Sequence, residues 1–325
     1  MNGKKWISAG LAMFFIHAGA HAAQSSSYPT KPIRFVVPYP PGGTTDIVGR
    51  GIGAKLTERF GHQVVVDNRG GASTIIGADA VAKSAPDGYT LLLATATTLS
   101  INPHVYAKLP YSINDFAPIT PATYVPFVIA AHPSLAANSI KELIALAKAK
   151  PGELRYSTPG RASTNHVAGA LFETMAGVKL LHVPYKGSGP AATAVLSGEV
   201  QFVITGIGTL AAHWKAGKLK VLAFGSDKRH PNWPDVPSTG EAGLKGYEAG
   251  TWFGVVTRAG TPRAIVQTLN KEIVAALNSP DLKDRLVALG FDVLTSSPEE
   301  FAQFIKTDSA RAAKAVKAAG IKLDN

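Results

Sequence analysis

A strand that turns directly into a helix near the start of this 325-residue chain constrains its fold most. The apolar run Phe35–Val37 leads into the turn residues Pro38–Gly43, and a helical pattern begins near Asp46. Apolar side chains then recur every fourth residue as far as Phe60, where a glycine follows as a helix stop. A buried strand, a glycine turn and an amphipathic helix in this order are typical of α/β folds.

The same order returns at Leu154–Thr158, followed by a second glycine turn and a helix that is expected to end at Gly177. Between the two junctions, the long apolar run Ile119–Ala131 carries two prolines and is interpreted as a strand that crosses between domains. Strand and helix signals alternate elsewhere, which predicts an α/β architecture of two lobes. We expect residues 24–124 with 226–325 to form the first lobe and residues 125–225 the second, with hinges near 121–127 and 221–226.

The first 23 residues have the pattern of an export signal. Lys4 and Lys5 precede a short apolar stretch, and Ala20–Ala22 forms an A-x-A cleavage site. Because the stretch is shorter than the roughly 20 residues that a spanning helix needs, cleavage after Ala22 or Ala23 is favoured over an uncleaved anchor. The pattern predicts a mature protein in the periplasm.

Composition narrows the classes of function. The chain contains no cysteine, which excludes disulfides, thiol catalysis and a lipid-anchor cysteine. Its 33 Lys and Arg residues exceed its 22 Asp and Glu residues, a formal net charge of +11. These charges are scattered singly along the predicted helices, so we interpret them as solvated faces and expect no nucleic-acid partner. The net charge favours the approach of an anionic solute.

The loops at the carboxyl ends of the strands are the expected ligand site, as in other open α/β sheets. This rule selects residues 38–46, 94–99, 157–165 and 205–209. In loops 38–46 and 157–165, glycines lie beside Thr or Ser just before a helix, so backbone amides and a helix N-terminus face the gap. One such loop is an ordinary turn with a cap, but two in corresponding positions predict an anion site between the lobes.

At these motifs, the sequence resembles the periplasmic substrate-binding proteins of tripartite tricarboxylate transporters, the Bug proteins. The resemblance covers essentially the whole mature chain. It rests on short motifs in a fixed order: Tyr28–Arg34, Val36–Asp46, Val66–Arg69, Pro86–Leu92, Ile101–Pro103, Gly160 with Ser163 and His166, Val183–Gly187, Ser197–Gly198, Pro234–Pro237 and Gly260–Pro262.

The resemblance implies a two-lobed flytrap that grips a carboxylate of a small organic acid and delivers it to the large and small subunits of a membrane transporter. It implies no catalytic residue, metal or cofactor, and we expect a monomer. The implied ligand residues of the first lobe are Tyr39, Gly42, Gly43, Thr44, Thr45 and Asp46. Those of the second lobe are Ser157, Thr158, Gly160, Ser163, Thr164 and Asn165. The strand-end loops add Thr97 and Thr205, and Thr44 and Ser163 are expected to hydrogen-bond the carboxylate.

The chain departs from the family pattern at three places. Gly70–Ser73 follows Arg69 where a proline is common, and Thr205–Gly206 stands where an acidic residue is common. Arg161 stands where a small or neutral residue is common. A guanidinium there would pair with a second anionic group of a di-acid; the alternative is that Arg161 faces solvent or pins an acidic side chain.

Three residues have a competing structural interpretation. Asp46 could face the ligand, but an Asp in the first turn of a helix typically stabilises the helix dipole and ties the loop, so a structural role is favoured. His166 and His182 have no histidine at metal-binding spacing near them, and a loop-bracing role is expected for His166.

Two other functions compete with solute binding. An exported serine hydrolase would need a G-x-S-x-G elbow, and the chain has none; it also completes no G-x-G-x-x-G fingerprint and contains no Walker loop. A receptor whose loaded form binds a sensor kinase stays open, because sequence alone does not separate transport from sensing.

Overall fold

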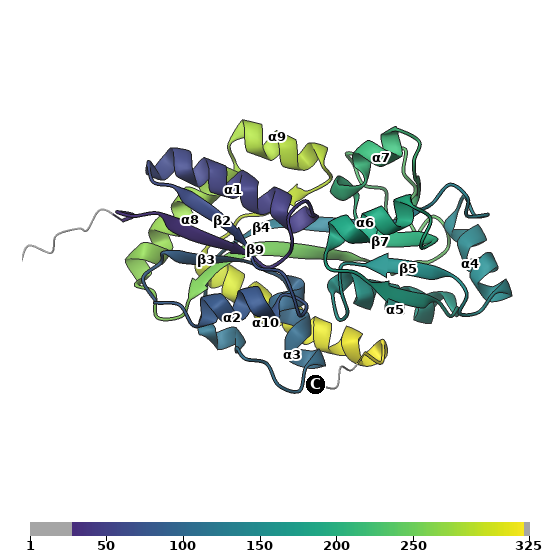
Figure 1. Cartoon of the computed structure of the whole chain (residues 1–325), viewed down its shortest axis with the longest axis horizontal. Coiled ribbons are helices and arrows are strands. Elements are labelled where there is room, and N and C mark those ends of the chain that lie inside the picture. Colours follow the sequence, from purple (N-terminus) through teal and green to yellow (C-terminus); the bar gives the residue numbers. More distant parts are fainter. Residues whose placement is uncertain (1–27, 322–325) are drawn as a thin grey trace, which may run out of the picture.

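The computed structural model describes residues 28–321, and the expected export signal and its cleavage site lie outside the described residues. Two α/β halves share one continuous sheet, whose path runs β2-β1-β3-β9-β4-β7-β5-β6, with β8 and β10 pairing at β4. Figure 1 shows the two halves side by side along the long axis. Within residues 28–321, no helix combines the length and apolar character needed to cross a lipid bilayer.

The first half contains the N- and C-terminal parts of the described chain. Its strands are β1 (Ile33–Val37), β2 (Val64–Asn68), β3 (Thr90–Thr95), β9 (Gly250–Arg258) and β10 (Asp292–Val293). Its helices are α1 (Thr44–Phe60), α2 (Ile75–Ala82), η1 (Thr97–Ile101), α3 (Asn102–Val105), η2 (Ile113–Asp115), α8 (Arg263–Leu277), α9 (Pro280–Ala288) and α10 (Pro298–Ala318). The sheet is buried because α1, α8 and α9 pack on one face, and α2 and α10 pack on the other.

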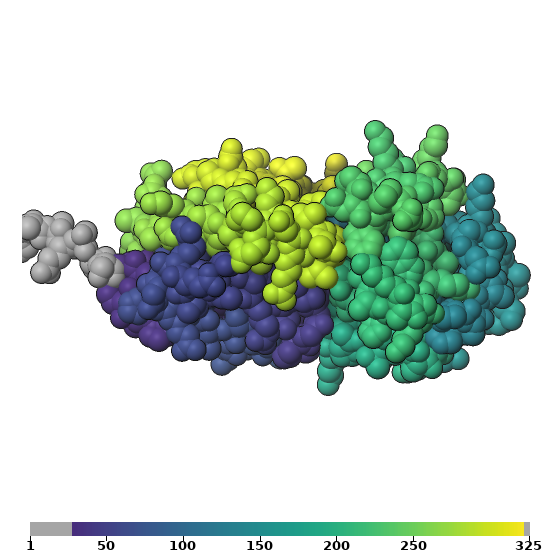
Figure 2. Space-filling view, turned by 90° about the horizontal axis from the view of Figure 1, so that it is seen from above, coloured from purple at the N-terminus to yellow at the C-terminus, as the bar shows by residue number. Residues whose placement is uncertain are grey.

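The second half repeats this layering with the middle of the chain. Its strands are β5 (Arg155–Thr158), β6 (Leu181–Pro184), β7 (Phe202–Gly206) and β8 (Lys220–Phe224). Its helices are α4 (Ile140–Ala149), α5 (Thr164–Ala176), α6 (Ser188–Leu196), η3 (Ile207–Thr209) and α7 (Ala211–Lys215). Helices α4 and α5 cover one face, and α6 and α7 cover the other. Figure 2 shows this teal-to-green half meeting the purple and yellow half along a seam.

The halves are joined by β4 (Phe116–Ala131), a 16-residue strand that belongs to both. Its first part pairs antiparallel with β9, and from Phe127 onward it pairs with β7. The expected crossing strand is therefore confirmed. The expected second hinge near residues 221–226 stays a prediction; β8 ends inside the second half, and the chain returns to the first half at the start of β9. At that point Phe127 N donates to Ala249 O at 2.9 Å, and Ala249 N donates to Gly225 O at 2.8 Å.

The segment between β8 and β9, residues 226–249, packs on the second half. The ring of Tyr247 is fully buried in the core with Phe172, and its hydroxyl donates to Ala168 O at 3.1 Å. The expected lobe boundary lies between residues 225 and 226, which would assign this segment to the first lobe. These contacts are instead with the core of the second half. Proline and glycine punctuate the segment without a strand or helix pattern, so its sequence does not indicate which half it joins.

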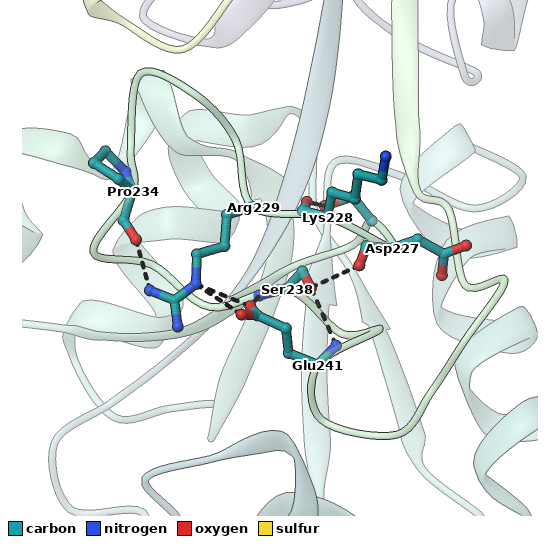
Figure 3. Close-up of polar contacts among 7 residues, drawn as sticks. Asp227, Lys228, Arg229, Pro234, Ser238 and Glu241 are labelled. Atoms are coloured by element: carbon teal, nitrogen blue, oxygen red, sulfur yellow. Dashed lines mark hydrogen bonds and ion pairs between the residues drawn. The ribbon is translucent and has the colours of Figure 1, made fainter.

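Polar contacts fix this segment on itself (Figure 3). Arg229 Nε donates to both carboxylate oxygens of Glu241, at 2.9 and 3.0 Å, and its Nη1 donates to Pro234 O at 2.6 Å. Ser238 Oγ donates to Asp227 O at 3.0 Å and accepts from the backbone N–H of Glu241. These contacts lie within residues 226–249 and hold the segment in a defined conformation rather than as a loose linker.

Candidate ligand-binding site

The first site loop runs from the end of β1 to the start of α1. Gly42 has φ +84°, a conformation that favours glycine, and Gly43 is the N-cap residue of α1. No side chain caps this helix. Its first backbone N–H groups, from Thr44 onward, are therefore open at the positive end of a 17-residue helix dipole. This arrangement suits an anion.

Asp46 braces this loop, as the structural interpretation expects. Its Oδ2 accepts from Gly42 N and Arg50 Nε, both at 3.0 Å, and its Oδ1 accepts from Asn68 Nδ2 at 2.9 Å. Burial by itself would raise the pKa of Asp46, but these hydrogen bonds outweigh burial and lower it. The carboxylate is thus ionised and fully engaged by the protein.

The second site loop connects β5 to α5, and here the helix is capped. Ser163 Oγ accepts from His166 N at 3.2 Å and donates to Gly160 O at 2.8 Å. The hydroxyl expected to hold a carboxylate is therefore committed to the cap of α5. Ala162 N donates to His166 Nδ1 at 3.1 Å, which holds Ala162 at φ +55°.

His166 and His182 meet behind this loop, although the sequence shows no spacing that pairs them. Their rings stack with centroids 3.9 Å apart, and His182 Nε2 lies 2.6 Å from Thr158 Oγ1. Burial, with Arg161 as a further cause, lowers the pKa of His166 to about 4. Burial, followed by His166 and Arg161, lowers the pKa of His182 to about 3. Both are neutral at neutral pH, and no group of three metal-ligating side chains occurs within residues 28–321.

A chamber of about 20 Å³ lies where the two halves meet. That volume holds about one water-sized group. No charged residue is among its lining residues, which are Tyr39, Thr44, Thr45, Thr95, Thr97, Phe127, Pro159, Thr164, Asn165, Ser188, Thr205, Gly206, Thr251 and Phe253. A chamber rich in hydroxyls and free of charges offers neutral hydrogen-bond donors at the N-terminus of α1.

Two of these hydroxyls are poised as donors. Thr205 Oγ1 is buried and has no hydrogen-bond partner among the described residues. A buried hydroxyl without a partner costs free energy unless something binds it. Burial raises the pKa of Tyr39 to about 12, against a hydrogen bond with Thr97 that lowers it, so its phenol keeps its proton.

Three hydrogen bonds close the halves on the chamber. Thr44 Oγ1 lies 2.9 Å from Thr209 Oγ1, and Thr164 N donates to Thr97 Oγ1 at 3.2 Å. Further out, the Ser73 hydroxyl donates to the backbone oxygen of Arg161. Each pair joins one half to the other, so the molecule is in a closed form.

The structure brings seven of the fifteen expected site residues to the chamber lining: Tyr39, Thr44, Thr45, Thr97, Thr164, Asn165 and Thr205. The other eight do not line it: Gly42, Gly43, Asp46, Ser157, Thr158, Gly160, Arg161 and Ser163. Ser157 Oγ donates to Ala191 O at 2.9 Å, and Thr158 Oγ1 donates to Gly160 O at 3.1 Å. Gly42 and Asp46 do not line the chamber but hold the first site loop in its conformation.

Sequence reasoning missed Thr95, Ser188 and Thr251 as lining residues. Thr95 ends β3 and lies within residues 94–99, which the strand-end rule selects, so the signal for it was present although it was not named as a site residue. Thr251 lies at the start of β9, an antiparallel strand to which the rule for parallel strands does not apply.

Comparison with known proteins identifies the family. Residues 48–321 match the model of the tripartite tricarboxylate transporter family receptor. The chain belongs to this family. It is 36% identical over 316 residues to the protein BugT of Bordetella pertussis, covering 96% of this chain and 97% of BugT.

Solved structures of similar receptors carry the same fold. A structure of R. palustris Rpa4515 with adipate has a TM-score of 0.88 and 36% identity, covering 91% of this chain and 99% of that one. MatC (Rpa3494) from Rhodopseudomonas palustris with bound malate has a TM-score of 0.84 and 30% identity, covering 89% of this chain and all of that one, 100%. The two-lobed fold expected from the sequence is thereby confirmed.

Proposed function

We propose that this receptor captures a small organic carboxylate between its lobes. The observation that carries the proposal is the uncapped N-terminus of α1 at a chamber lined by neutral donors. Such a chamber balances a carboxylate by amides, hydroxyls and the helix dipole rather than by a counter-ion. The bound adipate and malate of the two similar receptors support this choice of ligand class.

The site residues follow from this arrangement. We propose that Thr44, Thr45 and Thr205 contact the carboxylate from the chamber wall, with Tyr39 and Thr97 beside them. Asp46 and Ser163 hold the loops in place through their hydrogen bonds. For Ser163 we propose this capping role in place of the expected ligand role.

The lobes that close on the ligand are inferred to be residues 28–126 with 250–321, and residues 127–249. This division follows the packing of residues 226–249 on the second core and the crossings at Phe127 and Gly250. It moves the second boundary of the sequence-based division by 24 residues.

We further propose that the chain acts as a periplasmic monomer after cleavage near Ala22 or Ala23, and that it presents its closed form to the transporter's membrane subunits. A sensor kinase would also have to recognise the closed form, because either partner has to distinguish the closed form from the open one. We propose no chemistry on the ligand. The hydroxyl–imidazole contact of Thr158 and His182 is the kind of contact that a hydrolase uses, and it lies outside the chamber lining.

A thermal-shift screen of the mature protein against small carboxylates and their primary amides tests the proposal. An acid present at about 100 times its dissociation constant should add about 2.7 kcal/mol to the free energy of unfolding. The matching amide has the same shape without the charge and should add almost nothing. Acids and amides that shift the midpoint equally, or a panel of acids that never shifts it, would contradict carboxylate capture.

A further inference from the structure

A second cavity, of about 630 Å³, opens between the lobes beside the chamber. One wall is the loop from Gly70 to Thr74, and the opposite wall is formed by loops 159–161 and 184–187. The contact of Ser73 with the backbone of Arg161 bridges the two walls. The cavity therefore takes this shape only when the lobes are closed.

The cavity adjoins the chamber, because Tyr39 and Pro159 line both. The chamber has room for about one water-sized group. The body of an organic acid whose carboxylate enters the chamber must therefore extend outside it. Tyr39, Tyr106 and Tyr185 line the larger cavity and offer flat, largely apolar faces to a hydrocarbon chain.

The charges at this cavity are all positive. Arg161 and Lys186 line it, and no Asp or Glu does. Neither cation forms an ion pair with a carboxylate within residues 28–321. Both side chains are exposed, so their donors are open to an incoming group.

A third cavity, of about 310 Å³, also adjoins the chamber, through Thr164 and Thr251, but its charges differ. Glu248 and Asp308 line it, and its cation Arg311 is already paired with Asp308 at 2.7 Å. An anionic group that entered this cavity would be repelled by its carboxylates and would find no unpaired cation among the lining residues. The cavity with Arg161 and Lys186 is the better place for negative charge.

We propose that Arg161 and Lys186 form a second anion subsite, which binds the far acidic group of a linear dicarboxylate. This rests on the proposed function, since the first carboxylate occupies the chamber. Arg161 is suited to a two-pronged contact with a carboxylate, and Lys186 adds a second positive charge. The subsite makes this receptor selective for di-acids over mono-acids of the same length.

Calorimetry tests this with succinate, glutarate, adipate and pimelate, and with the monomethyl ester of each. The ester keeps one carboxylate and the chain length but removes the second charge. For the di-acid that binds wild type most tightly, we expect its ester to bind about tenfold or more weakly. Arg161→Ala should weaken that di-acid about tenfold and leave the ester within about twofold. Lys186→Ala should act in the same direction, and Arg161→Lys should retain part of the affinity.

Arg311→Ala is the matched control, because it removes a cation from the neighbouring cavity and should change neither affinity. A di-acid and ester of equal affinity in the wild-type protein would overturn the proposal whether or not the variants fold, and would leave carboxylate capture intact. A loss caused by Arg311→Ala but not by Arg161→Ala would overturn it too. The proposal would also be overturned if the receptor bound some other carboxylate but no acid of this series. If no acid in the screen bound at all, the proposed function itself would be overturned.

Discussion

At the scale of single residues, the structure separates hydroxyls that hold the protein together from a hydroxyl that waits for a partner. Ser157 and Ser163 donate to backbone carbonyls, whereas Thr205 Oγ1 is buried without a partner in the described chain. The sequence places all three next to strand ends and does not distinguish them. The difference depends on which carbonyl each hydroxyl meets after folding, so it emerges only from the tertiary structure.

Thr205→Val should therefore reduce affinity without reducing stability. Valine has nearly the same shape but no donor, and a hydrogen bond to a charged group contributes about 1.5–3 kcal/mol. We expect binding about tenfold weaker by calorimetry, with the free energy of unfolding unchanged or raised. Ser157→Ala is the control: it should lower stability by about 1 kcal/mol and leave affinity unchanged. Unchanged affinity in Thr205→Val would remove Thr205 from the site.

The stacked pair of His166 and His182 should make the fold sensitive to acid. Both folded-state pKa values are lowered, to about 4 and about 3, so unfolding takes up protons below the unfolded value near 6.5. Stability should fall as pH falls from about 6.5 toward about 4, measured as the urea midpoint at each pH. His182→Phe keeps a ring for stacking and should reduce this loss. An identical pH dependence in the variant would exclude the pair as its cause.

At the scale of elements, individual helices and strands could be predicted from the sequence, but the strand by which the chain returns to the first lobe could not. The helix at 46–60 and the crossing strand at 119–131 stand out by local periodicity, and both are present. The return through β9 depends on which strands become neighbours. Short apolar runs such as Leu219–Gly225 and Trp252–Val256 have the same local pattern, so periodicity alone does not identify the crossing strand.

The cap of α5 gives a prediction at this scale. Ser163→Ala removes the oxygen that accepts from His166 N, so it should cost about 1 kcal/mol of stability. Ser163→Gly is the matched variant, because glycine is a tolerated cap residue and should cost only a few tenths of a kcal/mol. Urea unfolding of the three proteins measures this. A normal stability in Ser163→Ala, combined with a large loss of affinity, would return Ser163 to the ligand.

At the scale of the whole molecule, α10 and the second lobe share a small apolar cluster in the closed form. Ile101 and Val105 of the first lobe and Ala162 and Val167 of the second pack with the end of α10. Together with the hydrogen bonds across the chamber, this cluster defines a closed state that a ligand would favour over an open one. The sequence predicts the two lobes but not the closing contacts, because these join residues far apart in the chain.

Ligand should therefore compact the protein in solution. Small-angle X-ray scattering of the mature chain should show a smaller radius of gyration with a saturating acid than without one, since a hinge at β4 and β9 allows the lobes to open. A radius that is the same with and without a ligand confirmed by calorimetry would contradict hinge closure.

Carboxylate capture at α1 is tested most directly by a crystal structure of the mature protein with the tightest-binding acid of the screen. We predict a carboxylate in the chamber, at the backbone N–H groups that begin α1, within hydrogen-bond distance of Thr205 Oγ1. A ligand whose carboxylate lies elsewhere, with Thr205 still unpaired, would contradict it.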